Sequence, residues 1–287
     1  MSCGGSPKAP RVLFYLPTYS SFQQQMPSHP LQADENNQSQ WFKEWFNHPF
    51  YLALYSHRNR QEATDCVNTI LRLTGIETTP PSGPAVLDIA CGAGRHALEF
   101  AKRGFAVTAN DLSPFLLQEA RNEAAEESLE LQFTEMDMRE ILSVEKYRMV
   151  VQLFTSFGYF NSAAEDRKVV SVASRALEPD GWYVLDLINP SYLKEHLIAH
   201  SNRTVGSLQV TENRVLEDGR ITKQITITPE TGKPLQFSES VMLYTYDEIT
   251  GMLEKEGFSV NYIAGDYSGS PYTEGGSSRM ILFSKKR

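Results

Sequence analysis

The sequence predicts an α/β protein built on a mostly parallel, doubly wound sheet. From residue 85 to about residue 200, short apolar runs alternate with amphipathic stretches of helical period, which is the pattern of repeated βαβ units. The first apolar run, Ala85–Ile89, leads through a glycine turn, Cys91–Gly94, into an amphipathic stretch, Arg95–Arg103. Hydrophobic residues make up 41% of the 287 residues, which is enough for a large buried core.

The turn between the first strand and the first helix of this sheet has the composition of a ligand cradle. Glycines let the backbone approach a ligand closely, and the first N–H groups of the helix point at it. Gly92-x-Gly94-x-x-Ala97 also fits the pattern of dinucleotide-binding proteins. Asp88 argues against a dinucleotide, because its charge would repel a pyrophosphate, whereas it suits a cationic ligand. A purely structural role for Asp88 and the glycines would not explain their spacing.

Residues 88–94, D-x-A-C-G-x-G, resemble motif I of the class I S-adenosylmethionine-dependent methyltransferases. The resemblance extends over residues 41–287 and is nearest to the small-molecule subgroup. It implies a Rossmann-like sheet of seven strands with the last strand antiparallel, and methyl transfer from S-adenosylmethionine to an N or O atom of a small molecule. The predicted cofactor-binding residues are Tyr51, Tyr55, Arg58, Asp88, Ala90, Gly92, Gly94, Asp111, Leu112, Asp137, Met138, Leu153 and Phe154.

The second strand, Ala106–Ala109, ends at an acid. Asp111 follows Asp88 by 23 positions, and an acid at the tip of the neighbouring strand is placed to accept both hydroxyls of a ribose. Leu112 can line the adenine site. The alternative is a helix N-terminal cap, because Ser113 and Pro114 open the next helix.

The third strand, Leu131–Thr134, leads to Asp137 and Met138. This resembles the third cofactor motif of the family, in which the carboxylate accepts the amine of adenine and the apolar residue covers the ring. An ordinary solvated loop acid is the alternative.

The fourth strand, Tyr147–Phe154, runs into an aromatic loop, Thr155–Phe160. The loop lacks the N-P-P-Y-like motif of enzymes that methylate DNA or protein amides, and it resembles instead a subgroup acting on small molecules. The faces of Phe157, Tyr159 and Phe160 can stabilise a sulfonium by cation–π attraction. Packing against the N-terminal helix is an equally good explanation for each ring.

A predicted helix, Val169–Leu177, and a turn at Glu178–Gly181 lead into a fifth strand, Trp182–Leu187. Residues 204–245 then switch to period two and predict an antiparallel insert near the substrate site. Residues 246–287 return to a helix and a closing strand pair. Between these strands, the loop Gly265–Tyr272 is either a specificity loop or a plain hairpin connection.

The N-terminal region divides into a flexible tail, residues 1–40, and a helical lid, residues 41–80, ahead of the catalytic domain at 81–203 and 246–287. Tyr51, Tyr55 and Arg58 share a helix face in the lid. The segment resembles lids in which a tyrosine and an arginine close over the carboxylate of the cofactor, which a guanidinium can bind bidentately.

No residue stands out as a general base, and the candidates are His57, Tyr159 and Asp266. Two other functions stay open, a nicotinamide-dependent oxidoreductase and a non-catalytic S-adenosylmethionine-binding module. A shift of the melting temperature with S-adenosylhomocysteine or with NAD distinguishes the first alternative. Whether the aromatic lid encloses room for a second molecule distinguishes an enzyme from the non-catalytic binding module.

Composition narrows the partners to a small-molecule acceptor. A formal net charge of −8 disfavours nucleic acid. Cys3, Cys66 and Cys91 match no metal-binding spacing, so we expect no metal and a reducing, cytoplasmic setting. No stretch is long enough to span a membrane.

Overall fold

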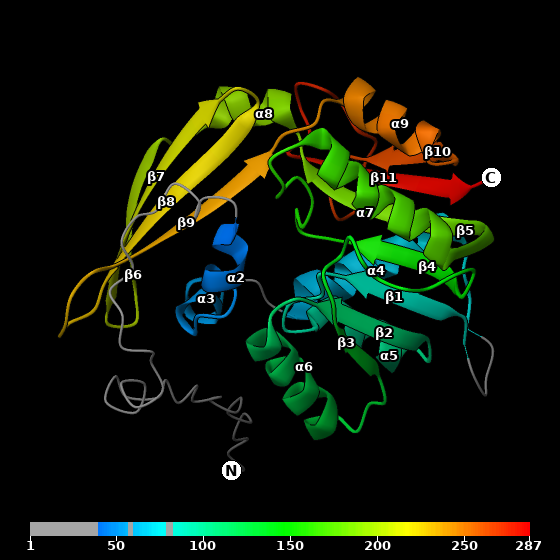
Figure 1. The fold of residues 1–287 in the computed structure, drawn as a ribbon, viewed down its shortest axis with the longest axis horizontal. Coiled ribbons are helices and arrows are strands. Elements are labelled where there is room, and N and C mark those ends of the chain that lie inside the picture. The colour runs from blue at the N-terminus through cyan, green and yellow to red at the C-terminus, as the bar shows by residue number, and fades with distance from the viewer. Residues whose placement is uncertain (1–39, 57–59, 79–82) are drawn as a thin grey trace, which may run out of the picture. The chain divides into compact units, whose positions relative to one another are not determined.

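The computed structural model describes residues 40–56, 60–78 and 83–287, so the expected tail lies outside the described residues except for Gln40. Within the described residues the chain forms one seven-stranded sheet and one four-stranded sheet (Figure 1). Two short helices, α2 (Trp41–Trp45) and α3 (Phe50–Leu54), lie beside the smaller sheet.

The seven-stranded sheet has the order β10-β11-β5-β4-β1-β2-β3. Its strands are β1 (Ala85–Ile89), β2 (Ala106–Asp111), β3 (Gln132–Glu135), β4 (Tyr147–Gln152), β5 (Leu177–Ile188), β10 (Phe258–Ala264) and β11 (Arg279–Lys286). β11 runs antiparallel to both of its neighbours, and the other pairs are parallel. The predicted doubly wound sheet is therefore confirmed. Its strand order reverses between β1 and β4, where such sheets bind ligands outside their carboxyl ends.

Helices cover both faces of this sheet. They are α4 (Arg60–Thr74), α5 (Arg95–Lys102), α6 (Pro114–Glu126), α7 (Ala163–Ala176) and α9 (Tyr246–Lys255). Successive strand side chains point to opposite faces: Val86 joins a core with residues of α4 and α5, whereas Leu87 joins one with residues of α7 and α9. In Figure 1, α7 and α9 lie in front of the sheet, with α4 and α5 behind it.

Two element boundaries differ from the sequence-based expectation. α7 begins at Ala163 rather than at Val169, because the Ser162 side chain caps it by accepting a hydrogen bond from the N–H of Glu165. Its first turn is polar, so hydrophobic periodicity misses it. The turn expected at Glu178–Gly181 lies within the bounds of β5, where Asp180 has a φ of 59° and the pairing with β4 shifts register.

The four-stranded sheet, which we call the insert sheet, has the order β6-β7-β8-β9 and is antiparallel throughout. Its strands are β6 (His200–Val205), β7 (Leu208–Glu217), β8 (Arg220–Thr228) and β9 (Leu235–Met242). It begins at His200 rather than at residue 204, after the short helix α8 (Pro190–His196). Asp218 and Gly219 join β7 to β8 with φ values of 49° and 73°, as a tight hairpin turn requires.

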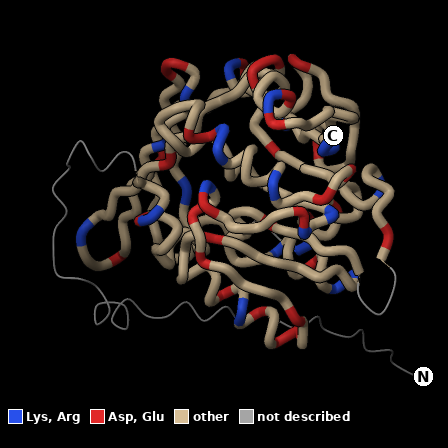
Figure 2. The backbone as a smooth tube through the Cα atoms, turned by 45° about the vertical axis from the view of Figure 1, so that its right-hand side comes forward, with Lys and Arg blue, Asp and Glu red and all other residues tan. Residues whose placement is uncertain are grey.

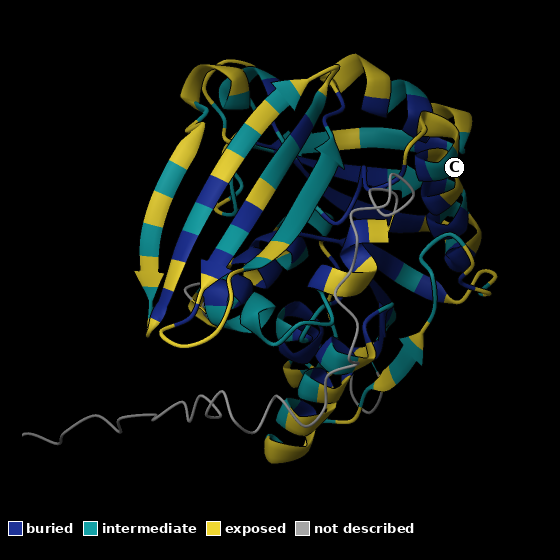
Figure 3. Ribbon diagram, turned by 60° about the vertical axis from the view of Figure 1, so that its left-hand side comes forward, coloured by how far each residue is buried: buried dark blue, intermediate teal, exposed yellow. Residues whose placement is uncertain are grey.

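Burial alternates along β6 and β7 of the insert sheet, whereas β9 is half-buried along most of its length (Figure 3). The inward side chains of the sheet, such as Val210, Ile225 and Ile227, belong to the same apolar core as Trp41 and Phe42 of the lid. Lid, insert sheet and the α7–α9 side of the main sheet are thus packed as one core.

Charged residues of both signs are interspersed along the described backbone (Figure 2). No helix in the described residues has the length and apolar character needed to cross a membrane.

Candidate active site

The turn after β1 folds as a cradle because three residues adopt left-handed backbone conformations. Ala90, Gly92 and Gly94 have φ values of 57°, 59° and 81°. A Cβ at Gly92 would meet no atom within 4 Å, whereas a Cβ at Gly94 would lie 2.9 Å from the Cβ of Ala120 on α6. Gly94 therefore allows the close packing of α5 against α6, and Gly92 leaves open space above the turn.

Asp88 brings an unpaired acceptor to this cradle. The residue is 2% exposed, and its Oδ2 atom has no hydrogen-bond partner within the part of the chain that the structure describes. Burial, together with the negative charge of Asp111, raises the pKa of Asp88 to about 8. A buried carboxylate oxygen without a partner is costly. It fits a ligand that brings a cation, such as the ammonium group of the expected cofactor.

Asp111 lies at the tip of β2, beside the cradle. Its carboxylate accepts hydrogen bonds from the N–H of Gly92, at 2.7 Å, and from the N–H of Ser113, at 2.8 Å. Burial raises the pKa of Asp111, and these hydrogen bonds offset part of that rise. Ser113 rather than Asp111 caps α6 through its side chain. Asp111 thus holds the glycine turn closed and keeps lone pairs for the hydroxyls of a ribose.

Asp137, predicted to accept the adenine amine, is engaged by Arg139. The guanidinium donates to both carboxylate oxygens, at 3.0 and 2.7 Å. Burial would raise the pKa of Asp137, but the hydrogen bonds from Arg139 outweigh it and lower the pKa. Met138 lies next to it, with its sulfur 3.5 Å from Nε2 of Gln152. A role in adenine binding stays a prediction, with Arg139 as a competitor for the carboxylate.

The residues directly after β4 are fixed by a buried ion pair that sequence reasoning missed. Phe154 and Thr155 have positive φ values of 58° and 63°. Asp186 on β5 accepts from the N–H of Phe154 at 2.8 Å, and Arg279 bonds both the Asp186 carboxylate and the Thr155 hydroxyl. Tyr267 donates to the same carboxylate at 2.8 Å. The signal in the sequence that could have revealed this ion pair is Asp186, an acid inside the otherwise apolar end of β5.

The ring of Phe154 lies between a cation and an aromatic ring. The guanidinium carbon of Arg95 is 3.6 Å from its centroid, and the ring of Tyr267 stacks on it at 5.0 Å and 11°. The preceding residue, Leu153, is buried in the same core as Phe154. These contacts set the conformation of the chain where β4 meets the crevice.

Tyr159 is surrounded by aromatic rings of the lid. Its ring centroid lies 5.0 Å from that of Trp41, 5.9 Å from that of Phe46 and 6.1 Å from that of Phe42. Tyr159 is 9% exposed. The main-chain oxygen of Phe46 also accepts from the Ser113 hydroxyl at 2.9 Å, which ties the lid to the loop after β2. The lid therefore bridges the cradle and the loop after β4.

Tyr55 contacts the insert sheet. Its hydroxyl donates to Glu239 on β9 and accepts from Lys223 on β8, each at 2.5 Å. Trp45 donates its indole N–H to the same Glu239 at 2.7 Å. Burial would raise the pKa of Glu239, but Lys223 and the two aromatic donors lower it. Tyr51 packs on Tyr55 with centroids 4.9 Å apart.

Of the three candidate bases, only two can be placed. His57, and with it Arg58, lies outside the described residues. Asp266 accepts from the N–H groups of Ser268 and Ser270 at 2.9 and 3.0 Å. Slight burial would raise the pKa of Asp266, but hydrogen bonds from Ser270 and Ser268 lower it. The carboxylate therefore organises its own turn and is a weak base, and His57 and Tyr159 both stay candidates.

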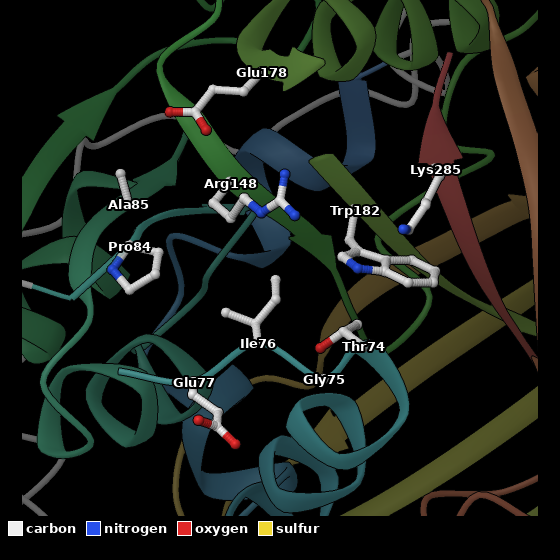
Figure 4. Close-up of a pocket in the computed structure, with 10 residues that line it drawn as sticks. All are labelled: Thr74, Gly75, Ile76, Glu77, Pro84, Ala85, Arg148, Glu178, Trp182 and Lys285. Atoms are coloured by element: carbon white, nitrogen blue, oxygen red, sulfur yellow. The ribbon is translucent and has the colours of Figure 1, made fainter. Parts of the chain in front are cut away.

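Neither a metal site nor the pocket in Figure 4 belongs to the cradle in the part of the chain that the structure describes. No group of three or more possible metal ligands occurs in the described ranges. A pocket of about 430 Å³ includes Ala85, Arg148, Trp182 and Lys285 in its lining (Figure 4). β1 and β4 begin there, so this pocket lies at the edge opposite to the cradle.

Comparison with known proteins agrees with the geometry. A family model described as "Methyltransferase domain" matches residues 86–181. The chain is 25% identical over 228 residues to dTDP-4-amino-2,3,4,6-tetradeoxy-D-glucose N,N-dimethyltransferase of Saccharopolyspora spinosa, covering 76% of this chain and 88% of that protein.

Solved structures share the fold. An S-adenosylmethionine-dependent methyltransferase from Clostridium acetobutylicum has a TM-score of 0.71 at 17% identity, over 83% of this chain and 96% of that one. CalS10, an amino pentose methyltransferase from Micromonospora echinaspora with bound S-adenosylmethionine, has a TM-score of 0.61 at 21% identity, over 84% of this chain and 98% of that one.

Proposed function

Because the chain is a class I S-adenosylmethionine-dependent methyltransferase, we propose that it methylates the amino nitrogen of a deoxyamino sugar carried on a nucleoside diphosphate. The family membership and the cofactor predicted from residues 88–94 are confirmed. The nicotinamide-dependent and non-catalytic alternatives are not favoured. An amino sugar is the acceptor named for the relative from Saccharopolyspora spinosa, and it supports this choice.

The cluster of aromatic rings formed by Trp41, Phe42, Phe46 and Tyr159, which we call the enclosure, is the observation that carries the proposal. Rings from the lid cover the loop after β4, beside the cradle. An enclosed aromatic site admits a compact sugar and excludes water. It admits a polymer only if one unit is turned into it, which costs a few kcal/mol and is usually aided by a basic surface. Acidic and basic residues are mixed along this chain, and the net charge is −8.

In the mechanism the protein mainly orients the cofactor and the acceptor and removes water from around the reacting groups. When bound, the cofactor supplies an electrophilic methyl group on sulfur. Asp88 would hold the ammonium group of the cofactor and Asp111 its ribose hydroxyls. The attacking amine must be neutral to offer its lone pair. Apolar surroundings lower the pKa of an ammonium group, so the rings of Trp41, Phe46 and Tyr159 favour the neutral amine without a dedicated base.

Transfer of labelled methyl from S-adenosylmethionine tests the acceptor. We expect label on dTDP-4-amino-2,3,4,6-tetradeoxy-D-glucose and none on the matching sugar with a hydroxyl in place of the amine. Total RNA, DNA and protein, at low and physiological salt, serve as further acceptors. Label on a polymer with none on the amino sugar would contradict the proposal, as would equal label on the amine and the hydroxyl.

We also propose that the protein works in the cytoplasm, where the substrates and cofactor are made. Cys66 and Cys91 are buried free thiols, which is compatible with a reducing compartment. Fractionation of cells with an antibody against the chain would test this.

A further inference from the structure

The main-chain oxygens on both sides of Tyr159 are held by the insert sheet. Arg220, the first residue of β8, donates to the carbonyl of Phe160 at 2.5 Å and to the carbonyl of Gly158 at 3.4 Å. The N–H of Met242, the last residue of β9, donates to the same Gly158 oxygen at 2.7 Å. A guanidinium presents several donors in a fixed plane, which suits it to hold two carbonyls at once.

An acid on α7 contacts the same loop through an N–H group, whereas Arg220 contacts its carbonyl groups. Asp166 is 1% exposed. Its carboxylate accepts from the N–H of Phe160 at 3.4 Å and from the hydroxyl of Tyr244 at 2.7 Å. Burial raises the pKa of Asp166 to about 6, and hydrogen bonding to Tyr244 and the charge of Arg220 oppose that rise. The Asp166 carboxylate thus accepts from an N–H group of this short loop, and the Arg220 guanidinium donates to two of its carbonyl groups.

Gly158 lets the loop and the insert sheet approach this closely. Its φ is 85°, and a Cβ there would lie 2.5 Å from the main-chain oxygen of Met242. Real Cβ atoms do not come so close to a carbonyl oxygen. The contact between the loop and β9 therefore depends on a glycine and leaves the loop little freedom to shift.

We propose that Arg220 and Asp166 are positioning residues that hold the Tyr159 ring in the acceptor site, so that the insert sheet is part of the catalytic framework. The proposal rests on the proposed function, because Tyr159 lines the acceptor site only if the aromatic enclosure receives the acceptor. The physical reason is orientation: misplacement of a reacting group by about 1 Å can slow a reaction roughly 100-fold.

The test compares three variants of the full chain. Arg220→Ala removes both carbonyl contacts, and Arg220→Lys keeps the charge but loses the planar pair of donors. Arg214→Ala is the matched control, because Arg214 lies on β7 of the same sheet and contacts Glu212 and the carbonyl of Ile198 rather than the loop. Hydrogen exchange over residues 157–161, followed by mass spectrometry, reports on the loop whatever the acceptor is. Calorimetry with S-adenosylhomocysteine and kinetics with the amino sugar complete the set.

We expect exchange over residues 157–161 to accelerate at least about tenfold in Arg220→Ala, and kcat to fall about 10- to 100-fold. Cofactor affinity should stay unchanged, Arg220→Lys should be intermediate, and Arg214→Ala should match the wild type. Wild-type exchange in Arg220→Ala, equal effects of Arg220→Ala and Arg214→Ala, or faster exchange with unchanged kcat would overturn the proposal. If the wild type does not methylate the amino sugar, the proposed function fails, and exchange alone decides whether Arg220 holds the loop.

Discussion

The cradle proposed for the cofactor and the enclosure proposed for the acceptor are built in different ways. The cradle comes from two adjacent strand tips and one glycine turn, all within residues 85–113. The enclosure joins the lid, the loop after β4 and the insert sheet, and Tyr55 meets Glu239 across 184 positions. The cradle also contains a buried acceptor, Oδ2 of Asp88, that has no partner among the described residues. In the enclosure the corresponding half-buried carboxylate, Glu239, is held by three donors.

The difference lies in what the carboxylates contact: Asp88 in the cradle has an oxygen left over for a ligand, whereas Glu239 in the enclosure is bonded to other parts of the protein. We expect the carboxylate in the cradle to gain a partner when the cofactor binds. The carboxylates in the enclosure fasten one element to another. Changes in the cradle should therefore affect affinity for the cofactor, whereas changes in the enclosure should affect stability and acceptor kinetics.

Substitution of the glycines at positions 158 and 92, both with positive φ, should give the largest change in the free energy of unfolding. Gly158→Ala should destabilise the protein by about 2–5 kcal/mol, because a side chain at positive φ costs about 1–2 kcal/mol and forcing an atom into packed structure adds about 1–3 kcal/mol. Gly92→Ala should cost only the first of these, since nothing lies within 4 Å of its Cβ. Urea unfolding of both variants measures the difference. Equal losses would mean that the close approach of Met242 to Gly158 is not rigid.

Asp111→Ala should weaken binding of S-adenosylhomocysteine by about 1.5–3 kcal/mol, because charge-assisted hydrogen bonds to the ribose are lost. This corresponds to about 10- to 150-fold in affinity. Isothermal calorimetry on the folded variant measures it, with Asp137→Ala as a parallel test of the adenine prediction. Unchanged affinity in Asp111→Ala would remove the ribose assignment.

Asp88 should make cofactor binding depend on pH. The pKa of Asp88 is about 8 without ligand, and a bound ammonium group favours the ionised form, so binding releases a proton. Affinity for S-adenosylhomocysteine should therefore rise from pH 6 towards pH 8, by at most about tenfold per pH unit. Asp88→Asn and the ligand adenosine, which has no ammonium group, should both give flat profiles. A rise that persists in Asp88→Asn would assign the proton to another group.

Tyr55→Phe should have the smallest effect. It removes one hydroxyl from the contact with Glu239 and Lys223 and leaves their ion pair in place, so we expect a loss of about 0.5–1.5 kcal/mol of stability. Cofactor affinity should stay the same, as thermal unfolding with and without S-adenosylhomocysteine would show. A selective loss of cofactor affinity would instead support the prediction that Tyr55 faces the carboxylate of the cofactor.

The strands, the glycine turn and the acids at the strand tips were accessible from the sequence, because each depends on neighbouring residues. The start of α7 was not, since a serine cap and a polar first turn carry little periodic signal. The pair of Asp186 and Arg279 was missed for another reason. Each residue interrupts or precedes an apolar run, and only the antiparallel pairing of β5 with β11 brings them together.

By itself, the sequence determined the order of the main sheet's elements, the cradle at residues 88–94 and the placement of Asp111 one strand away. These features follow from side-chain period, from the freedom of glycine and from short-range spacing. Tertiary structure alone decided that Tyr55 meets Glu239, that Asp186 fixes the end of β4 and that Arg220 holds the loop at Tyr159. The partners in these contacts are 32 to 184 residues apart. Their approach depends on the packing of whole sheets, which no local pattern encodes.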